Sequence, residues 1–152
     1  MDINAVIREM IILLRDETAR YNILVGMNLA SDLPQVMADR VQWQQVFMNL
    51  MMNAIEAMKN VEGMRELDIK SQRAENNQLL LSVTDTGVGL PAQQTEQIFN
   101  AFFTTKAHGT GMGLRICRSI VEAHNGRLWA TANPERGATF HITLPAKVEA
   151  QE

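Results

Sequence analysis

Residues 67–89, LDIKSQRAENNQLLLSVTDTGVG, contain the clearest signal for the fold class. Residues 67–71 alternate between apolar and polar side chains, as expected of a half-exposed strand. Asn76-Asn77 predicts a turn, and residues 79–85 form a second apolar run that ends in Asp85. Strands joined by such a short turn pair in antiparallel fashion, because a parallel pair needs a long crossover. The stretch therefore predicts a β-hairpin and argues against a doubly wound nucleotide fold.

Helices and further strands flank this hairpin. The spacing of apolar residues predicts helices over about 2–14, 39–59, 91–99 and 112–124, with Asp2 and Asp39 as N-terminal caps. Strands are predicted at 23–29, 127–132 and 138–144, and an irregular loop at 100–110. Because hairpin strands are segregated from three long helices, we predict an α+β fold. It would be a two-layer α/β sandwich whose mixed, mostly antiparallel sheet is covered on one face by three helices.

Composition limits the class of protein. The chain has 152 residues, a net charge of -3 and 46% hydrophobic residues, which suits a single globular domain with its core at about 2–145 and a polar tail at 146–152. It has no basic run, so nucleic acid is not expected as a partner. No apolar run approaches the ~20 residues of a membrane span, so we expect no membrane contact by this domain. The single Cys117 excludes an intrachain disulfide and is expected to be a small core residue in a reducing, cytoplasmic setting.

Two asparagines stand out on the helix predicted at 39–59. Asn49 and Asn53 are four residues apart, so they share one side of the helix, at the border of its apolar face. Carboxamide oxygens are hard, neutral ligands that suit a magnesium ion already bound to phosphate. Two surface asparagines, or caps, are the alternative interpretation, and the helix alone favours it.

Two glycine-rich turns follow this helix. Asp85 ends an apolar strand and opens the turn at 86–89, where a carboxylate could accept a hydrogen bond from the exocyclic amine of adenine. Residues 109–113 precede a helix, whose first N–H groups attract anions such as phosphate. They match neither the Rossmann nor the P-loop pattern. An ordinary Asp-Thr-Gly turn and a loop without a ligand remain the alternatives.

The segment between the two turns, residues 98–106, holds three of the five phenylalanines and ends in Lys106. Its rings could anchor a mobile lid while Lys106 reaches a phosphate. Alternatively, the rings fill the core and Lys106 is a solvated charge.

In these segments the chain resembles the ATP-binding catalytic domain of bacterial sensor histidine kinases, in the Bergerat-fold ATPase superfamily. Residues 49–58 are similar to the family's N box and residues 85–90 to its G1 box. Residues 99–106 are similar to its F box and residues 109–114 to its G2 box. The resemblance covers nearly all of residues 2–145. The sequences of the N box and the F box are similar to those of the nitrogen-regulation and oxygen-sensing subgroup.

The resemblance implies ATP and Mg²⁺ as ligands, with Asn53 on the metal and Asn49 and Lys106 supporting the phosphates. Asp85 would bind the adenine amine. The other residues implied to contact nucleotide are Ala57, Gly87, Gly89, Leu90, Thr105, Gly109, Thr110, Gly111, Met112, Gly113, Leu114 and Thr139. Glu56 departs from the pattern, since many relatives place a phosphate-contacting lysine there.

Family members pass the γ-phosphate to a histidine on a two-helix dimerisation domain and then to a response-regulator aspartate. None of His108, His124 and His141 lies in such a hairpin, so the acceptor is expected on a dimerisation domain of the same parent protein. A response regulator receiver domain is expected downstream, whether or not the parent protein is bound to a membrane.

Hydrolysing relatives carry a glutamate at the position of Asn49. An amide cannot act as a general base, so we expect negligible ATP hydrolysis. An anti-sigma-type serine kinase and a non-catalytic adenine-nucleotide-binding module remain as alternative functions.

Overall fold

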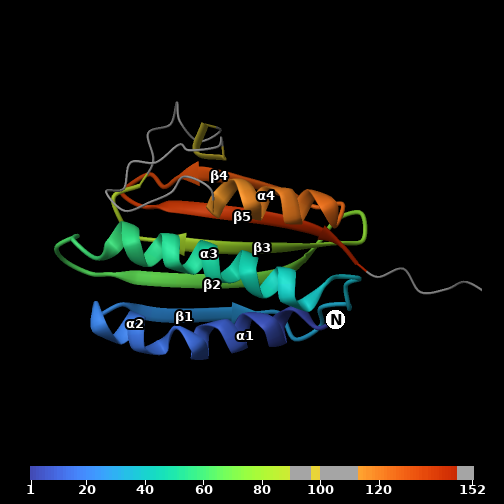
Figure 1. The fold of residues 1–152 in the computed structure, drawn as a ribbon, viewed down its shortest axis with the longest axis horizontal. Helices are drawn as coiled ribbons and strands as arrows, with labels where there is room; N and C mark the ends of the chain where they lie inside the picture. Colours follow the sequence, from blue (N-terminus) through green and yellow to red (C-terminus); the bar gives the residue numbers. More distant parts are fainter. Residues whose placement is uncertain (90–96, 100–112, 147–152) are drawn as a thin grey trace, which may run out of the picture.

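The computed structural model describes residues 1–89, 97–99 and 113–146, and Figure 1 shows its α+β arrangement. Five strands form one sheet in the order β1-β2-β3-β5-β4. They are β1 (Leu24–Leu29), β2 (Glu66–Ala74), β3 (Gln78–Asp85), β4 (Arg127–Ala132) and β5 (Ala138–Pro145). β1 runs parallel to β2 and the other neighbours are antiparallel. The prediction of a mixed, mostly antiparallel sheet is confirmed.

Helices cover one face of this sheet (Figure 1). They are α1 (Ile3–Leu13), α2 (Arg15–Arg20), α3 (Arg40–Met58) and α4 (Gly113–Ala123), with a short 3-10 helix, η2, at Gln97–Phe99. α1, α3 and α4 are the three long helices that the sequence predicts. Of the short helix predicted at 91–99, residues 91–96 lie outside the described part of the chain and Gln97–Phe99 form η2. In the described ranges no helix combines the length and hydropathy that a membrane span requires.

Both predicted helix caps are present. One carboxylate oxygen of Asp2 accepts the N–H groups of Asn4 and Ala5, and one of Asp39 accepts those of Val41 and Gln42. The separate helix α2 was not predicted. Leu14 leaves the helical conformation with ψ of 10° and ends α1, and α2 then starts with Asp16 and Glu17 in its first turn, where acidic residues suit the helix dipole.

The hairpin of β2 and β3 has the predicted turn, in which Asn76 and Asn77 both adopt a left-handed conformation, with φ of 60° and 57°. Its register pairs Ile69 with Val83 and Leu67 with Asp85. Alternate residues of β3 are buried, from Leu79 to Asp85. The Asp85 side chain therefore points from the end of β3 to the helix-covered face.

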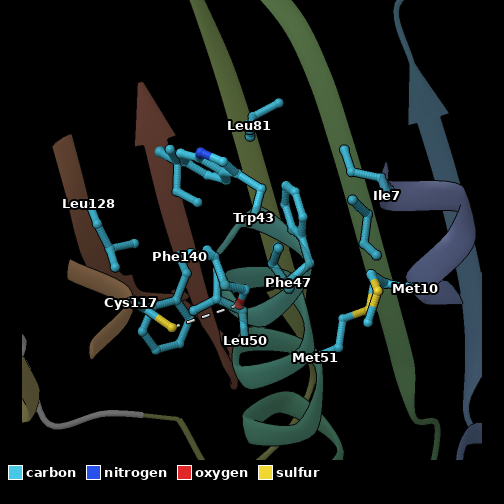
Figure 2. Packing of buried hydrophobic residues seen from close by; sticks show 14 of the residues in the cluster. Ile7, Met10, Trp43, Phe47, Leu50, Met51, Leu81, Cys117, Leu128 and Phe140 are labelled. Atoms are coloured by element: carbon cyan, nitrogen blue, oxygen red, sulfur yellow. Dashed lines mark hydrogen bonds between the residues drawn. The ribbon is translucent and has the colours of Figure 1, made fainter. Parts of the chain in front are cut away.

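α3 lies at the centre of the core. Figure 2 shows Trp43, Phe47, Leu50 and Met51 of α3 between the sheet residues Leu81 and Phe140 and the neighbouring helices. These four α3 side chains are at most 1% exposed. Because they fix the rotation of α3 about its axis, Asn49 and Asn53 lie half-buried at the border of the apolar face.

Candidate functional site

The site is built around Asp85, which is only 2% exposed. A buried carboxylate is costly unless it is hydrogen-bonded, and its Oδ1 accepts the Gly87 N–H at 2.9 Å. The bond folds the chain back two residues after the strand ends. It also ties the carboxylate to the following glycine turn.

This turn packs against the last turn of α3. The Val88 N–H donates to the Ala57 carbonyl at 3.1 Å. A Cβ atom added to Gly87 would lie 2.6 Å from the Ala57 carbonyl oxygen, so no side chain fits there. The structure thus brings together three predicted site residues, Ala57, Asp85 and Gly87.

A second backbone approaches the turn from the β4–β5 hairpin. Gly89 has a φ of 77°, and a Cβ atom there would lie 3.1 Å from the Gly137 carbonyl oxygen. A Cβ atom on Gly137 would lie 2.0 Å from the Asp85 carbonyl oxygen. Gly137 was not predicted as part of the site. A glycine directly before the strand that begins at Ala138 indicates a tight turn, but it does not indicate a contact with Asp85.

Asn49 lies at the other end of the site, against α4. A Cβ atom on Gly113 would lie 3.9 Å from Asn49 Cγ, so the first residue of α4 faces this carboxamide. Burial raises the pKa of Cys117, one turn further along α4, to about 12, and a hydrogen bond with the Asn49 side chain opposes that rise. The Asn49 carboxamide therefore rests on the first turn of α4.

Asn49, Asn53 and Ala57 form a row on one side of α3, because each is four residues from the next. At 1.5 Å per residue the row is ~12 Å long. It runs from the start of α4 to the turn after Asp85. The predicted amide ligands thus share one side of α3 with Ala57, whose carbonyl accepts the Val88 N–H of the turn after Asp85.

Thr139 and Leu114 are two further residues that the resemblance implies in nucleotide binding. Thr139 pairs with Thr84, the residue before Asp85. Because paired residues share a face and successive residues of a strand point to opposite faces, the Thr139 side chain lies on the sheet face opposite to the Asp85 carboxylate. Leu114 is half-buried and packs on the core. Contacts of these two residues with nucleotide stay predictions.

Several predicted residues lie outside the described part of the chain. They are Leu90, Thr105, Lys106, Gly109, Thr110, Gly111 and Met112.

A cavity of about 540 Å³ lies between α1 and α3, lined by residues such as Met10, Leu13 and Met48. It contains none of the predicted nucleotide-binding residues, so we do not assign it to the nucleotide.

The chemistry of Asn53 suits the predicted magnesium nucleotide, because an amide oxygen is a hard ligand for Mg²⁺. Over residues 1–89, 97–99 and 113–146, no group of three or more His, Cys, Asp or Glu side chains is arranged to hold a metal ion. A magnesium ion there would depend on amide and phosphate oxygens, which is the ligand set that Asn53 and ATP provide.

Comparison with known proteins places the chain in a family. A family model described as histidine kinase-, DNA gyrase B-, and HSP90-like ATPase matches residues 38–148. The chain belongs to this family. Within it, the chain is similar to catalytic domains of sensor histidine kinases, as the following relatives show.

The sensor histidine kinase TmoS of Ectopseudomonas mendocina is 41% identical over 147 residues, which are 95% of this chain and 15% of TmoS. The sensor protein FixL of Bradyrhizobium diazoefficiens is 45% identical over 128 residues, 84% of this chain and 25% of FixL. The chain therefore spans a quarter or less of these two relatives.

Among solved structures, the nucleotide-free catalytic domain of the histidine kinase ThkA superposes with a TM-score of 0.83 at 36% identity, covering 95% of this chain and 93% of that domain. ThkA in complex with the response regulator protein TrrA gives a TM-score of 0.81 at 32% identity, over 97% of this chain and 41% of ThkA. The resemblance to histidine kinase catalytic domains and the predicted fold are both confirmed.

Proposed function

We propose that this domain binds Mg-ATP and donates the γ-phosphate to a histidine on a dimerisation domain of its parent protein. A response regulator receiver domain would then take the phosphate. The observation that carries the proposal is the row of Asn49, Asn53 and Ala57, which joins the start of α4 to the turn after Asp85. One extended ligand with an amine at one end and anionic oxygens at the other suits this row.

At the Asp85 end, the carboxylate would accept the exocyclic amine of adenine, since a carboxylate is an acceptor only. Gly87 and Gly89 leave the backbone open to a flat ring. At the Asn49 end, the N–H groups at the start of α4 carry the positive end of the helix dipole toward the phosphates. Asn53 lies between the two ends, where its amide oxygen would bind the magnesium ion. Bound Mg²⁺ would neutralise charge on the phosphates.

Two observations bear on the acceptor of the phosphate: one on water as the acceptor, the other on the histidines of this chain. An amide at position 49 cannot remove a proton from water. The two described histidines are already engaged. His124 Nε2 accepts the Asp39 N–H while Nδ1 donates to the Ile120 carbonyl, and His141 Nε2 is 2.9 Å from Thr131 Oγ1. His108 lies outside the described residues, and its sequence context is not a dimerising helical hairpin, so we assign the imidazole nucleophile to another domain.

A labelling experiment tests this function. The purified chain is mixed with labelled ATP, Mg²⁺ and the dimerisation domain of its parent protein. We expect label on the dimerisation domain that is lost in acid and kept in base, as phosphohistidine is. Acid-stable label on serine would support the serine-kinase alternative, and nucleotide binding without any transfer would support the non-catalytic module. Sustained ATP hydrolysis by the chain alone would contradict the role given to Asn49.

A further inference from the structure

The main-chain carbonyl of Asp85 has an unusual partner. The pairing of β3 with β5 extends to Thr84 and Thr139, so Asp85 lies one residue beyond the last pair. The Asp85 carbonyl oxygen accepts a hydrogen bond from Nδ2 of Asn133, at 3.3 Å. Asn133 follows β4 at the start of the β4–β5 hairpin. A side chain from one strand connection thus holds the backbone at the end of another strand.

The orientation of the Asn133 carboxamide follows from its partners, because the Asp85 carbonyl can only accept a hydrogen bond and so requires the NH₂ group. The Asn133 Oδ1 accepts the Thr139 hydroxyl at 2.8 Å. Thr139 Oγ1 lies 3.1 Å from Thr84 Oγ1, and because the Thr139 proton goes to Asn133, Thr84 is the donor in that pair. The Asn133 N–H donates to the Gly137 carbonyl at 3.0 Å. Only one carboxamide orientation satisfies all these bonds, and it points the NH₂ group at Asp85.

The hairpin also packs directly on the peptide that follows Asp85. Gly137, with a φ of 90°, lies so close that an added Cβ atom would be 2.9 Å from Thr86 Cα. On the far side of this peptide, Thr86 Oγ1 donates to the Met64 carbonyl at 3.1 Å. The guanidinium of Arg136 bonds the same Met64 carbonyl and the Glu62 carbonyl. The turn is therefore held between the hairpin and the loop that precedes β2.

We propose that Asn133 is a positioning residue of the adenine site, and that it makes the site specific for an amine at the six position of the purine. By holding the Asp85 carbonyl, Asn133 fixes the backbone from which the carboxylate projects. A fixed carboxylate accepts a hydrogen bond from an amine at the six position of the purine and repels a carbonyl oxygen at the same position. A carboxylate on a loose backbone would turn away and discriminate less. This inference rests on the proposed function, since it requires adenine at Asp85.

The experiment compares adenosine diphosphate with inosine diphosphate, which has a carbonyl oxygen in place of the amine. Calorimetry gives both dissociation constants, with Mg²⁺ present, for the wild type, Asn133→Ala and Thr139→Val. Glu135→Ala is the matched control, because Glu135 is exposed on the same hairpin. Thr139→Ser keeps the hydroxyl that orients Asn133. Thermal unfolding of each variant is recorded in parallel.

We expect Asn133→Ala and Thr139→Val to weaken adenosine diphosphate binding about three- to tenfold, the range for one lost hydrogen bond, and to change inosine diphosphate binding less than about twofold. Glu135→Ala should behave as the wild type, and Thr139→Ser should lie closer to it than Thr139→Val does.

Two results would overturn the inference. One is unchanged preference for adenosine diphosphate in both variants. The other is an equal loss for both nucleotides with a lower melting temperature, which would make Asn133 a residue of general stability. If Asn133→Ala does not fold, Thr139→Val decides between the same results. A wild type that binds neither nucleotide would instead reject the proposed function itself.

Discussion

A methyl group added to Gly87 would lie 2.6 Å from the Ala57 carbonyl oxygen, whereas one added to Gly113 would come no closer than 3.9 Å to Asn49 Cγ. We name the two ends of the site after their proposed ligands. The first position belongs to the purine end, which we define as Ala57, Asp85, Gly87 and Gly137. The second belongs to the phosphate end, Asn49 and Gly113. Backbone packed on backbone fixes the purine end, while at the phosphate end, among the described residues, the start of α4 faces a polar side chain. Shape and directed hydrogen bonds suit recognition of a base, and charge suits recognition of phosphates.

The largest effect should come from Gly87→Ala. Its Cβ atom would collide with backbone atoms of Ala57 that cannot move without shifting α3. We expect the free energy of unfolding to fall by about 1–3 kcal/mol, as in other overpacked sites, and adenosine diphosphate binding to be lost. Urea unfolding and calorimetry measure both.

Gly113→Ala is the matched control for stability. Alanine replaces glycine in a helix without a close contact, so the free energy of unfolding should change by less than about 1 kcal/mol. Equal destabilisation by the two alanines would remove the contrast between the ends.

Asp85→Asn tests the purine end by chemistry instead of shape. The amide presents a donor as well as an acceptor, which leaves a buried group mismatched beside an adenine amine. Binding of adenosine diphosphate should weaken by about 1–3 kcal/mol. Calorimetry at constant Mg²⁺ checks this value, and unaltered affinity would reject Asp85 as the adenine ligand.

Asn53→Ala tests the row between the two ends. Mg²⁺ should strengthen ATP binding to the wild type, and the variant should lose that dependence while its free energy of unfolding changes by no more than about 1 kcal/mol. Titrations of ATP with Mg²⁺ and with a chelator give the comparison. A Mg²⁺ dependence that survives the substitution would place the metal elsewhere.

The smallest effect concerns pH and His141 on β5, the strand that follows Gly137. Partial burial lowers the pKa of His141 below its ordinary value of 6.5. The unfolded chain therefore binds this proton at a higher pH than the folded chain does. Stability from His141 is fully present above about pH 6.5 and is lost as the pH falls through the interval between 6.5 and its lower pKa in the folded chain.

Denaturation at about pH 7.5 and about pH 5.5 should reveal this slope, and His141→Gln should reduce it. An identical slope in the variant would assign the acid sensitivity to other groups.

Much of the fold could be predicted because its signals are local. Alternation in β3, caps at Asp2 and Asp39, and the turn at Asn76 and Asn77 each depend on neighbouring residues. Helix α2 was missed, because residues 15–20 include only one apolar side chain, Ala19, and so have no apolar periodicity.

From the sequence, the candidate site could be predicted only as separate motifs, without the contacts between them. The positions of Asn49 and Asn53 on one side of a helix follow from their spacing. The contacts of Asp85 with Gly137 and Asn133 depend on β5 lying beside β3, and no local pattern fixes which strands become neighbours. The face occupied by Thr139 depends on the same register, and a shift by one residue would reverse it.

Cys117 is the one cysteine in the chain, it is fully buried, and its pKa is raised to about 12. At neutral pH only ~1 in 10⁵ of these thiols is ionised, so alkylating reagents should leave it intact. A cysteine introduced at Val88, which is 77% exposed beside the glycine turn, would then be the reactive thiol of the domain. A fluorescent dye attached there would report nucleotide arrival in real time without removal of the native sulfur.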